Sequence, residues 1–228
     1  MKRCFLEVAV DSLKAMKAAE EAGADRVELC ANLEEGGISP SDQLLSKAVA
    51  QSNVPIRVMV RPRSGNFSYT NEEFQLMKNE ISRAKKAGIQ GVVLGLLLNK
   101  EEIDVERTRM LVDLSRPMKA TFHRAFDTLK NTLEALDQVI ATGVDTLLTS
   151  GGTESAEQGV EMIAKLVKKS KDRISILAGG GIRGTNVAKI VKAAGVRAVH
   201  VGGALSASQL IEEIEERVRF VRRELVGL

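Results

Sequence analysis

The sequence predicts an α/β fold, a single-domain (β/α)₈ barrel of the TIM type that spans residues 1–228. Two observations predict it: strand-length apolar segments alternate with helical patterns eight times, and one helix–glycine–strand junction recurs four times. The length also suits one large domain with a sizeable core. A doubly wound open sheet is the alternative, because repeats occur there too. The number of strands and the even spacing of the repeats favour the barrel.

The recurring junction has the same order each time: a helix end, a glycine, a small or branched apolar residue, two further residues and a short apolar strand. We expect each glycine to end its helix in the left-handed conformation, after which the chain turns into a buried strand. The four segments are Glu20–Cys30, Lys85–Gly95, Ala141–Ser150 and Lys192–Gly202.

The segments between these junctions supply the remaining elements. Strand segments are apolar on alternate positions, and helical segments are amphipathic. The expected strands are Phe5–Val10, Ile56–Arg61, Met118–Arg124 and Ile174–Gly179. The expected helices include Asn71–Lys86, Asp104–Ser115, Asn131–Thr142, Ala156–Lys169 and a last helix over 206–226.

Composition excludes several classes of protein. A net charge of +3, basic residues interleaved with acidic ones and only 3% aromatic residues argue against a nucleic-acid partner. The longest apolar run, Gly91–Leu98, is too short to span a membrane. Asp11 and Lys14 interrupt the first apolar stretch too soon for a signal peptide, and two cysteines form no disulfide framework or zinc-finger spacing. We expect a cytoplasmic protein without a membrane partner.

Alternation within the strands directs five ionisable side chains into the barrel: Glu7, Glu28, Arg61, His123 and His200. Burying them is costly unless they pair with one another or with a ligand. They also lie toward the carboxyl ends of the strands, where barrel enzymes place their chemistry. We therefore expect a pocket in which the glutamates and histidines act as catalytic acids and bases. A satisfied interior cluster of ion pairs is the alternative.

Glycine-rich turns follow the last two strands, with Gly180 and Gly181 in the first and Gly202 and Gly203 in the second. Exposed backbone N–H groups in such turns can hold an anion, so we expect a small phosphorylated or carboxylated ligand there. Glycines that only permit tight turns are the alternative. Other polar residues expected to bind the substrate at this rim are Asn32, Arg61, Arg63, Arg124 and Ser150. The loops Ala31–Ser41 and Pro62–Glu73 are long enough to act as lids, and ordinary surface loops without that role are the alternative.

Several long motifs of the chain resemble the CutC family, which is named for copper homeostasis. They occur in collinear order and include ADRVELCANLEEGGISPS (Ala24–Ser41), VMVRPRSGNFSY (Val58–Tyr69), TFHRAFD (Thr121–Asp127) and AGGGIR (Ala178–Arg183). The resemblance implies a cytoplasmic single-domain barrel that binds copper and forms homo-oligomers.

The resemblance also implies Cys30 as a copper ligand, since Cu(I) prefers thiolates, thioethers and imidazoles. Members of the family commonly have a cysteine where this chain has Ala9, so one thiolate of a two-thiolate site is missing. Met59 is an inward-facing thioether, although a methionine that fills the barrel is the alternative. A metal site made of His123 and His200 with Glu7 or Glu28 is a further alternative.

Two hypotheses about function remain open at this point. The chain is either a copper-homeostasis protein that binds copper ions, or an enzyme (an isomerase, lyase or hydrolase) that acts on a small anionic metabolite. A barrel that binds such a metabolite without turnover is a third. None of them requires an organic cofactor.

Overall fold

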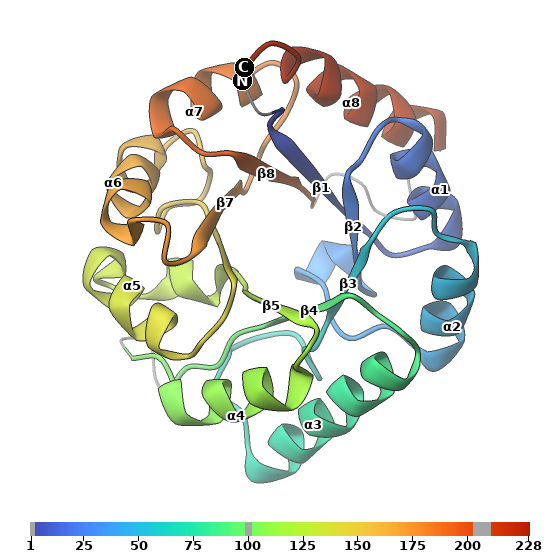
Figure 1. Ribbon diagram of the computed structural model, residues 1–228, viewed down its shortest axis with the longest axis vertical. Helices are drawn as coiled ribbons and strands as arrows, with labels where there is room; N and C mark the ends of the chain where they lie inside the picture. Colours follow the sequence, from blue (N-terminus) through green and yellow to red (C-terminus); the bar gives the residue numbers. More distant parts are fainter. Residues whose placement is uncertain (1–2, 99–101, 203–210) are drawn as a thin grey trace.

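The computed structural model describes residues 3–98, 102–202 and 211–228. Within these ranges, eight parallel strands close into one barrel in sequence order, and β8 pairs with β1. Figure 1 shows this ring of strands inside a ring of helices. The strands are β1 Phe5–Val10, β2 Arg26–Leu29, β3 Ile56–Met59, β4 Gly91–Leu94, β5 Lys119–Phe122, β6 Thr146–Thr149, β7 Ser175–Gly179 and β8 Ala198–Val201. The predicted (β/α)₈ barrel is confirmed, and the open sheet is excluded.

The helices pack their apolar faces on the outward side chains of the strands and form the main core with them. In the described ranges they are α1 Leu13–Glu21, α2 Asp42–Gln51, α3 Asn71–Lys86, α4 Val105–Ser115, α5 Thr132–Ala141, α6 Val160–Ser170, α7 Val187–Ala194 and α8 Ile211–Glu224. Side chains cap several of their first turns; Thr70 and Glu73 form a reciprocal capping box at α3. Among the described residues, no helix combines the length and apolar character needed to cross a membrane.

The repeated glycine junction is confirmed. Gly23, Gly88, Gly143 and Gly195 have φ angles of 95°, 81°, 83° and 68°, in the left-handed region that favours glycine. Each follows a helix and precedes a strand, so one local conformation turns the chain inward four times.

Near the carboxyl ends of strands, three predicted elements differ from the structure by two or more residues at one bound. β3 ends at Met59, and β5 ends at Phe122 because His123 caps a short 3₁₀ helix, η2 (Arg124–Thr128). α6 begins at Val160, since the N–H of Ala156 bonds the carbonyl of Gly180 instead of entering a helix. The predicted last helix matches α8 from residue 211 to Glu224, two residues before its predicted end; residues 206–210 lie outside the described residues.

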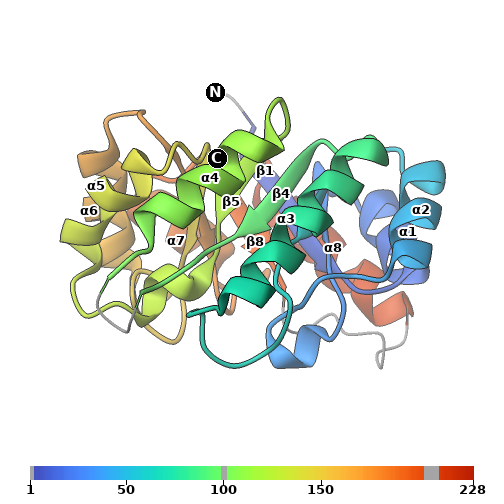
Figure 2. The same cartoon turned by 90° about the horizontal axis from the view of Figure 1, so that it is seen from below.

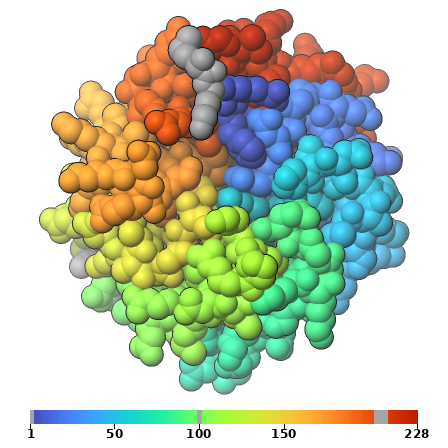
Figure 3. All heavy atoms as spheres, in the orientation of Figure 1, coloured from blue at the N-terminus to red at the C-terminus, as the bar shows by residue number. Residues whose placement is uncertain are grey.

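The two ends of the barrel differ. Figure 3 views the amino ends of the strands, where the centre is filled with atoms. At the opposite end, the 3₁₀ helix η1 (Leu33–Glu35) extends beyond the strands, as the side view in Figure 2 shows. This end, formed by the carboxyl termini of the strands, holds the candidate site.

Candidate functional site

A cavity of about 370 Å³ opens at the carboxyl end of the barrel. Side chains on strands β2, β8 and the loops after β3 and β5 line it, together with the turns after β7 and β8. The predicted site residues that line it are Glu28, Arg61, His123, Arg124, Gly180, Gly181, His200 and Gly202. The structure therefore brings most of the predicted pocket together.

Glu7 lies just below this cavity and is fully buried. Strand register places it level with Arg26 on β2 and His200 on β8. Its Oε2 accepts from Arg26 Nε at 2.5 Å, and its Oε1 is 2.8 Å from Nδ1 of His200. Burial alone would raise the pKa of Glu7, but the bond to His200 and the charge of Arg26 lower that pKa to about 2. Glu7 is therefore a partnered anion.

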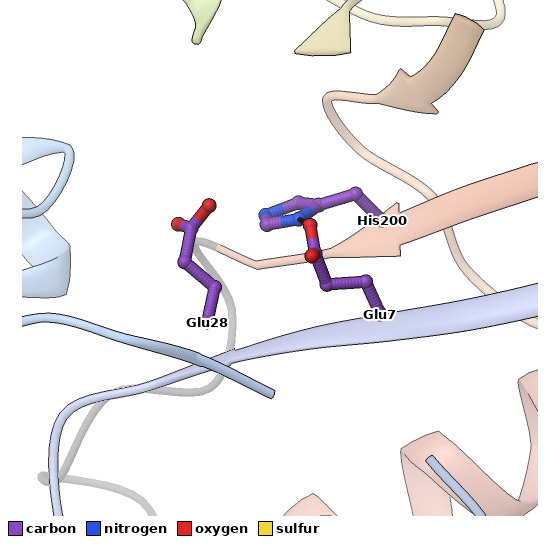
Figure 4. A group of neighbouring side chains, drawn as sticks. All are labelled: Glu7, Glu28 and His200. Carbon is purple, nitrogen blue, oxygen red and sulfur yellow. Dashed lines mark hydrogen bonds and ion pairs between the residues drawn. The ribbon is translucent and has the colours of Figure 1, made fainter. Parts of the chain in front are cut away.

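His200 is one of the two partners of Glu7. Burial opposes its charge, yet the carboxylates of Glu28 and Glu7 together raise the pKa of His200 above its usual value. In Figure 4 the imidazole lies between the two carboxylates, with Glu7 on one side and Glu28 on the other. His200 thus lies on the cavity wall with its charged form favoured, and Glu7 holds the ring in position from below.

Glu28 has the opposite environment. It is buried, it makes no hydrogen bond to any described residue, and its Oε2 has no partner. Burial, reinforced by the charge of Glu7, raises the pKa of Glu28 to about 7 against the opposing effect of His200. Near neutral pH its carboxyl group therefore exists in both protonation states, and it is free to exchange a proton with a ligand.

His123 is buried between Phe67, whose ring centre is 5.0 Å away, and the backbone of Gly95, where an added Cβ would lie 2.6 Å from the imidazole. The N–H of Ala125 donates to Nδ1 at 3.2 Å, so the proton of the neutral ring is on Nε2. That N–H group has no partner in the described part of the chain. Burial and the charge of Arg61 lower the pKa of His123 to about 3, which keeps the ring neutral.

Arg61 joins the two long loops, Ala31–Ser41 and Pro62–Glu73. Its Nη1 donates to the carbonyls of Gly37 (2.9 Å) and Glu35, and its Nη2 donates to Gly65. The guanidinium also lies over the ring of Phe67. Its Nε is buried without a partner among the described residues.

Arg124 reaches the cavity from η2 and is held by Asp127. Asp127 Oδ2 accepts from Arg124 Nε, Ser150 N and Ser150 Oγ, each at 2.9 Å. Its Oδ1 accepts from Thr149 and Gly152. Arg124 Nη2 donates to Ser150 Oγ, whereas Nη1 takes part in no hydrogen bond of the described residues. Asp127 therefore fixes the direction of a guanidinium that still has donors to offer.

The turn after β7 lies against this guanidinium. Gly180 and Gly181 have φ angles of 100° and 70°, and a Cβ on Gly180 would lie 3.2 Å from Arg124 Nη1. None of the hydrogen bonds of the described residues is donated by the backbone N–H of either glycine. Consecutive N–H groups in such a conformation form an anion-binding concavity. Gly202 lines the same cavity, whereas Gly203 lies outside the described residues.

Three predicted binding residues lie elsewhere. Arg63 pairs with Glu73 at 2.5 Å and donates to the carbonyls of its own loop. Asn32 is exposed, in the left-handed conformation that starts η1. Ser150 is completely buried and supports Arg124. None of the three lines the cavity, because internal partners of the loops occupy their side chains or turn them away.

The surroundings of Cys30 do not suit the role of a copper ligand. Its side chain is fully buried in an apolar cluster with Ala9, Leu33, Met59 and Val93, and it does not line the cavity. Its Sγ is 3.6 Å from the carbonyl of Val10. Burial raises the pKa of Cys30 far above its usual value, so the thiolate that a copper ion requires is strongly disfavoured.

Glu7, Glu28 and His200 form a group whose ligand atoms lie within 4.8 Å of one another. Two oxygens and one nitrogen are a hard donor set, which suits Cu(I) poorly. Both oxygens of Glu7 are also occupied by Arg26 and His200. A metal ion here would have to displace those bonds, and the group fits proton transfer better.

The site residues predicted from the sequence do not include Asp127, nor Glu35 and Leu33, which line the cavity from η1. For Asp127 a local signal exists, because Arg124 and Asp127 are three residues apart, the spacing of a helical ion pair. No comparable signal marks η1, whose position over the barrel depends on Arg61 contacts from another loop.

Comparison with known proteins identifies the family. The CutC family model matches residues 4–205. The family protein CutC of Vibrio vulnificus (strain CMCP6) is 44% identical over 200 residues, which are 87% of this chain and 80% of that protein. The family protein CutC of Pasteurella multocida (strain Pm70) is 40% identical over 198 residues, covering 87% of this chain and 81% of that protein.

Solved structures agree with this result. The copper homeostasis protein CutC from Streptococcus agalactiae superimposes with a TM-score of 0.81 at 31% identity, covering 87% of this chain and 98% of that one. Phosphoribosylanthranilate isomerase from Thermococcus kodakaraensis superimposes with a TM-score of 0.65 at 14% identity, covering 99% of this chain and 100% of that one, which shows the fold alone. The chain belongs to the CutC family.

Proposed function

We propose that this CutC-family barrel binds a small phosphorylated or carboxylated metabolite in its cavity and catalyses a proton transfer on it. The observation that carries the proposal is a set of buried polar atoms without partners among the described residues: Glu28 Oε2, Arg61 Nε and His123 Nε2. All three side chains line one cavity. An unsatisfied buried polar atom costs about 1–3 kcal/mol, and a polar ligand would remove that cost.

The charges of the cavity support an anionic ligand. His200 carries a raised pKa, and Arg61 and Arg124 are guanidinium ions. Arg124 Nη1 and the N–H groups of Gly180 and Gly181 would hold the anionic end, because all three donors lie at one side of the cavity. Glu28 and His123 would then meet the rest of the ligand.

Isothermal titration calorimetry with inorganic phosphate and with 2-phosphoglycolate tests this proposal. We expect both to bind the wild type, and Arg124→Ala to weaken binding at least about tenfold through loss of a charge-assisted contact. The matched control is Arg197→Ala, because the side chain of Arg197 is 85% exposed and forms a 3.9 Å ion pair with Asp172 on the surface. A wild type that binds neither anion, or a control that weakens binding equally, contradicts the proposal.

Copper homeostasis is the second candidate function. The name of the Streptococcus agalactiae relative supports it. The buried, protonated thiol of Cys30 argues against a copper site there, so we propose that Cys30 is not a copper ligand in this chain. Competition with a chromogenic Cu(I) chelator should give the same copper affinity for wild type and Cys30→Ser. A loss of tight, stoichiometric binding in Cys30→Ser would restore the copper role.

The expected homo-oligomer and the cytoplasmic location stay predictions. Sedimentation velocity measures the first, and fractionation of cells that produce the protein measures the second.

A further inference from the structure

Two groups with complementary chemistry lie on different sides of the cavity. Glu28 comes from β2 and His123 follows β5, three strands farther around the closed barrel. Each has a buried polar atom with no partner in the described ranges. Both side chains line the same cavity, so a ligand there lies between a carboxyl group on one side and an imidazole ring on the other.

Glu28 is the group suited to act as a base. No hydrogen bond ties its carboxylate to the described residues, and its pKa of about 7 makes it a stronger base than an ordinary glutamate while leaving it partly ionised at neutral pH. His200 is less suited, because Glu7 holds its Nδ1 and favours the charged ring, which has no lone pair to accept a proton.

His123 is suited to stabilise a developing oxyanion without giving up its proton. Ala125 fixes the tautomer in which Nε2 carries the hydrogen. Packing against Phe67 and Gly95 holds the ring, so the N–H is preorganised. A neutral imidazole is a hydrogen-bond donor appropriate to a carbonyl oxygen that becomes an enolate.

We propose that the cavity enolises a small α-hydroxy ketone or aldehyde whose far end carries a phosphate or carboxylate. This inference rests on the proposed function, since the anionic end must be held near Arg124. The carboxylate of Glu28 takes the proton from the carbon beside the carbonyl. The C–H electron pair forms a C=C bond, the carbonyl π pair moves to oxygen, and His123 Nε2–H donates a hydrogen bond to that oxygen. Protonated Glu28 then returns a proton to the same carbon, so no redox partner or leaving group is needed.

Solvent deuterium exchange detects this step. Dihydroxyacetone phosphate is the probe, incubated with the protein in D₂O while ¹H NMR follows its carbon-bound hydrogens. Glycerol 3-phosphate is the matched control ligand, because it has the same phosphate and chain but no carbonyl. We expect both to bind, and only dihydroxyacetone phosphate to exchange, at least about tenfold faster than in buffer without protein.

Variants assign the roles. Glu28→Gln should lower the exchange rate about 100-fold or more while leaving the affinity for glycerol 3-phosphate within about threefold. His123→Asn should lower the rate about 10- to 100-fold. Glu213→Gln, on the exposed face of α8, is the control and should leave the rate unchanged. The wild-type rate should rise with pH and level off above about 7, where Glu28 is ionised.

The outcomes separate this inference from the proposed function. Binding of both phosphates without exchange in the wild type overturns enolisation and leaves anion binding intact. A wild type that binds neither of the two phosphates overturns both the inference and the proposed function. Exchange that persists at full rate in Glu28→Gln excludes Glu28 as the base, and with it this inference.

Discussion

Buried charged side chains occur in two regions of the barrel interior, the layer just below the cavity and the wall of the cavity, and these regions differ in how completely the side chains are paired. Just below the cavity, Glu7 has Arg26 and His200 as partners, and Arg57 donates to Thr121. Toward the carboxyl end, Glu28 and His123 line an open cavity with polar atoms that have no partner in the described part of the chain. Glu7 and Glu28 occupy adjacent strands, and both are buried.

Burial of a charged residue does not by itself mark a functional site. Burial with complete pairing stabilises a fixed charge, so the pKa of Glu7 falls to about 2. Burial without pairing favours the neutral form, so the pKa of Glu28 rises to about 7. Only the second condition leaves a group able to exchange protons near neutral pH.

The largest expected effect comes from removing the carboxylate of Glu7, which Arg26 and His200 bind. Glu7→Gln leaves the buried His200 and the partly buried Arg26 without their anion, so we expect a loss of about 3–5 kcal/mol in the free energy of unfolding. Urea unfolding at pH 7 measures it. Glu213→Gln, at an exposed position, should change stability by less than about 0.5 kcal/mol. A Glu7→Gln variant as stable as the wild type would show that the pairing is unimportant.

Glu28, which lacks a partner among the described residues, should cause the next largest effect, a dependence of the free energy of unfolding on pH. The folded state binds the Glu28 proton more tightly than the unfolded state, in which the carboxyl group has the ordinary glutamate pKa of 4.5. The stability that this proton contributes is present below about pH 4.5 and is lost as the pH rises to about 7. Relative to Glu28→Gln, the wild type should therefore lose on the order of 3 kcal/mol across that window.

Urea unfolding of both proteins from pH 4.5 to pH 8 measures this difference, with Glu213→Gln repeated over the same series. A constant difference between wild type and Glu28→Gln across the whole range would mean that Glu28 ionises normally, and the contrast with Glu7 would disappear.

A smaller effect is expected at Asp127, whose two carboxylate oxygens are both hydrogen-bonded and which holds Arg124 at the cavity. Asp127→Asn removes the charge that Arg124 and the loop after β6 bind, so we expect a loss of about 1–3 kcal/mol in stability and about tenfold weaker phosphate binding. Asp137→Asn is the control, because Asp137 pairs with Lys169 and Arg173 on the surface. If phosphate affinity is unchanged in Asp127→Asn, Asp127 does not position Arg124 for binding.

The smallest effect should come from replacing either cysteine, because the two thiols have similar surroundings. Cys4 and Cys30 are both buried thiols with raised pKa values and are free of disulfides. Each Cys→Ala change should cost about 1 kcal/mol through lost packing. Thermal unfolding compares the two variants. A much larger loss for Cys30→Ala would reveal a role beyond packing.

The sequence was sufficient for the fold and for part of the site. Local patterns repeat, so the glycine junctions such as Gly23 and Gly143 predicted the barrel without knowledge of distant contacts. Alternation along strands also predicted that Glu28 and His200 face inward.

Pairing could not be predicted in the same way. The partner of Glu7 depends on the stagger between β1 and β8, whose residues lie almost 200 positions apart in the chain. Arg63 and Arg61 are two residues apart, yet one bonds within its own loop and the other lines the cavity. Nothing in the local sequence separates them, since the difference is set by tertiary contacts.

A crystal structure of the protein soaked in inorganic phosphate tests the anion site most directly. We expect one phosphate at the carboxyl end of the barrel, in contact with Arg124 Nη1 and the N–H groups of Gly180 and Gly181, and no bond between Glu28 and any described residue. A cavity that contains no phosphate, or one in which Glu28 and His123 bond to each other, would contradict it.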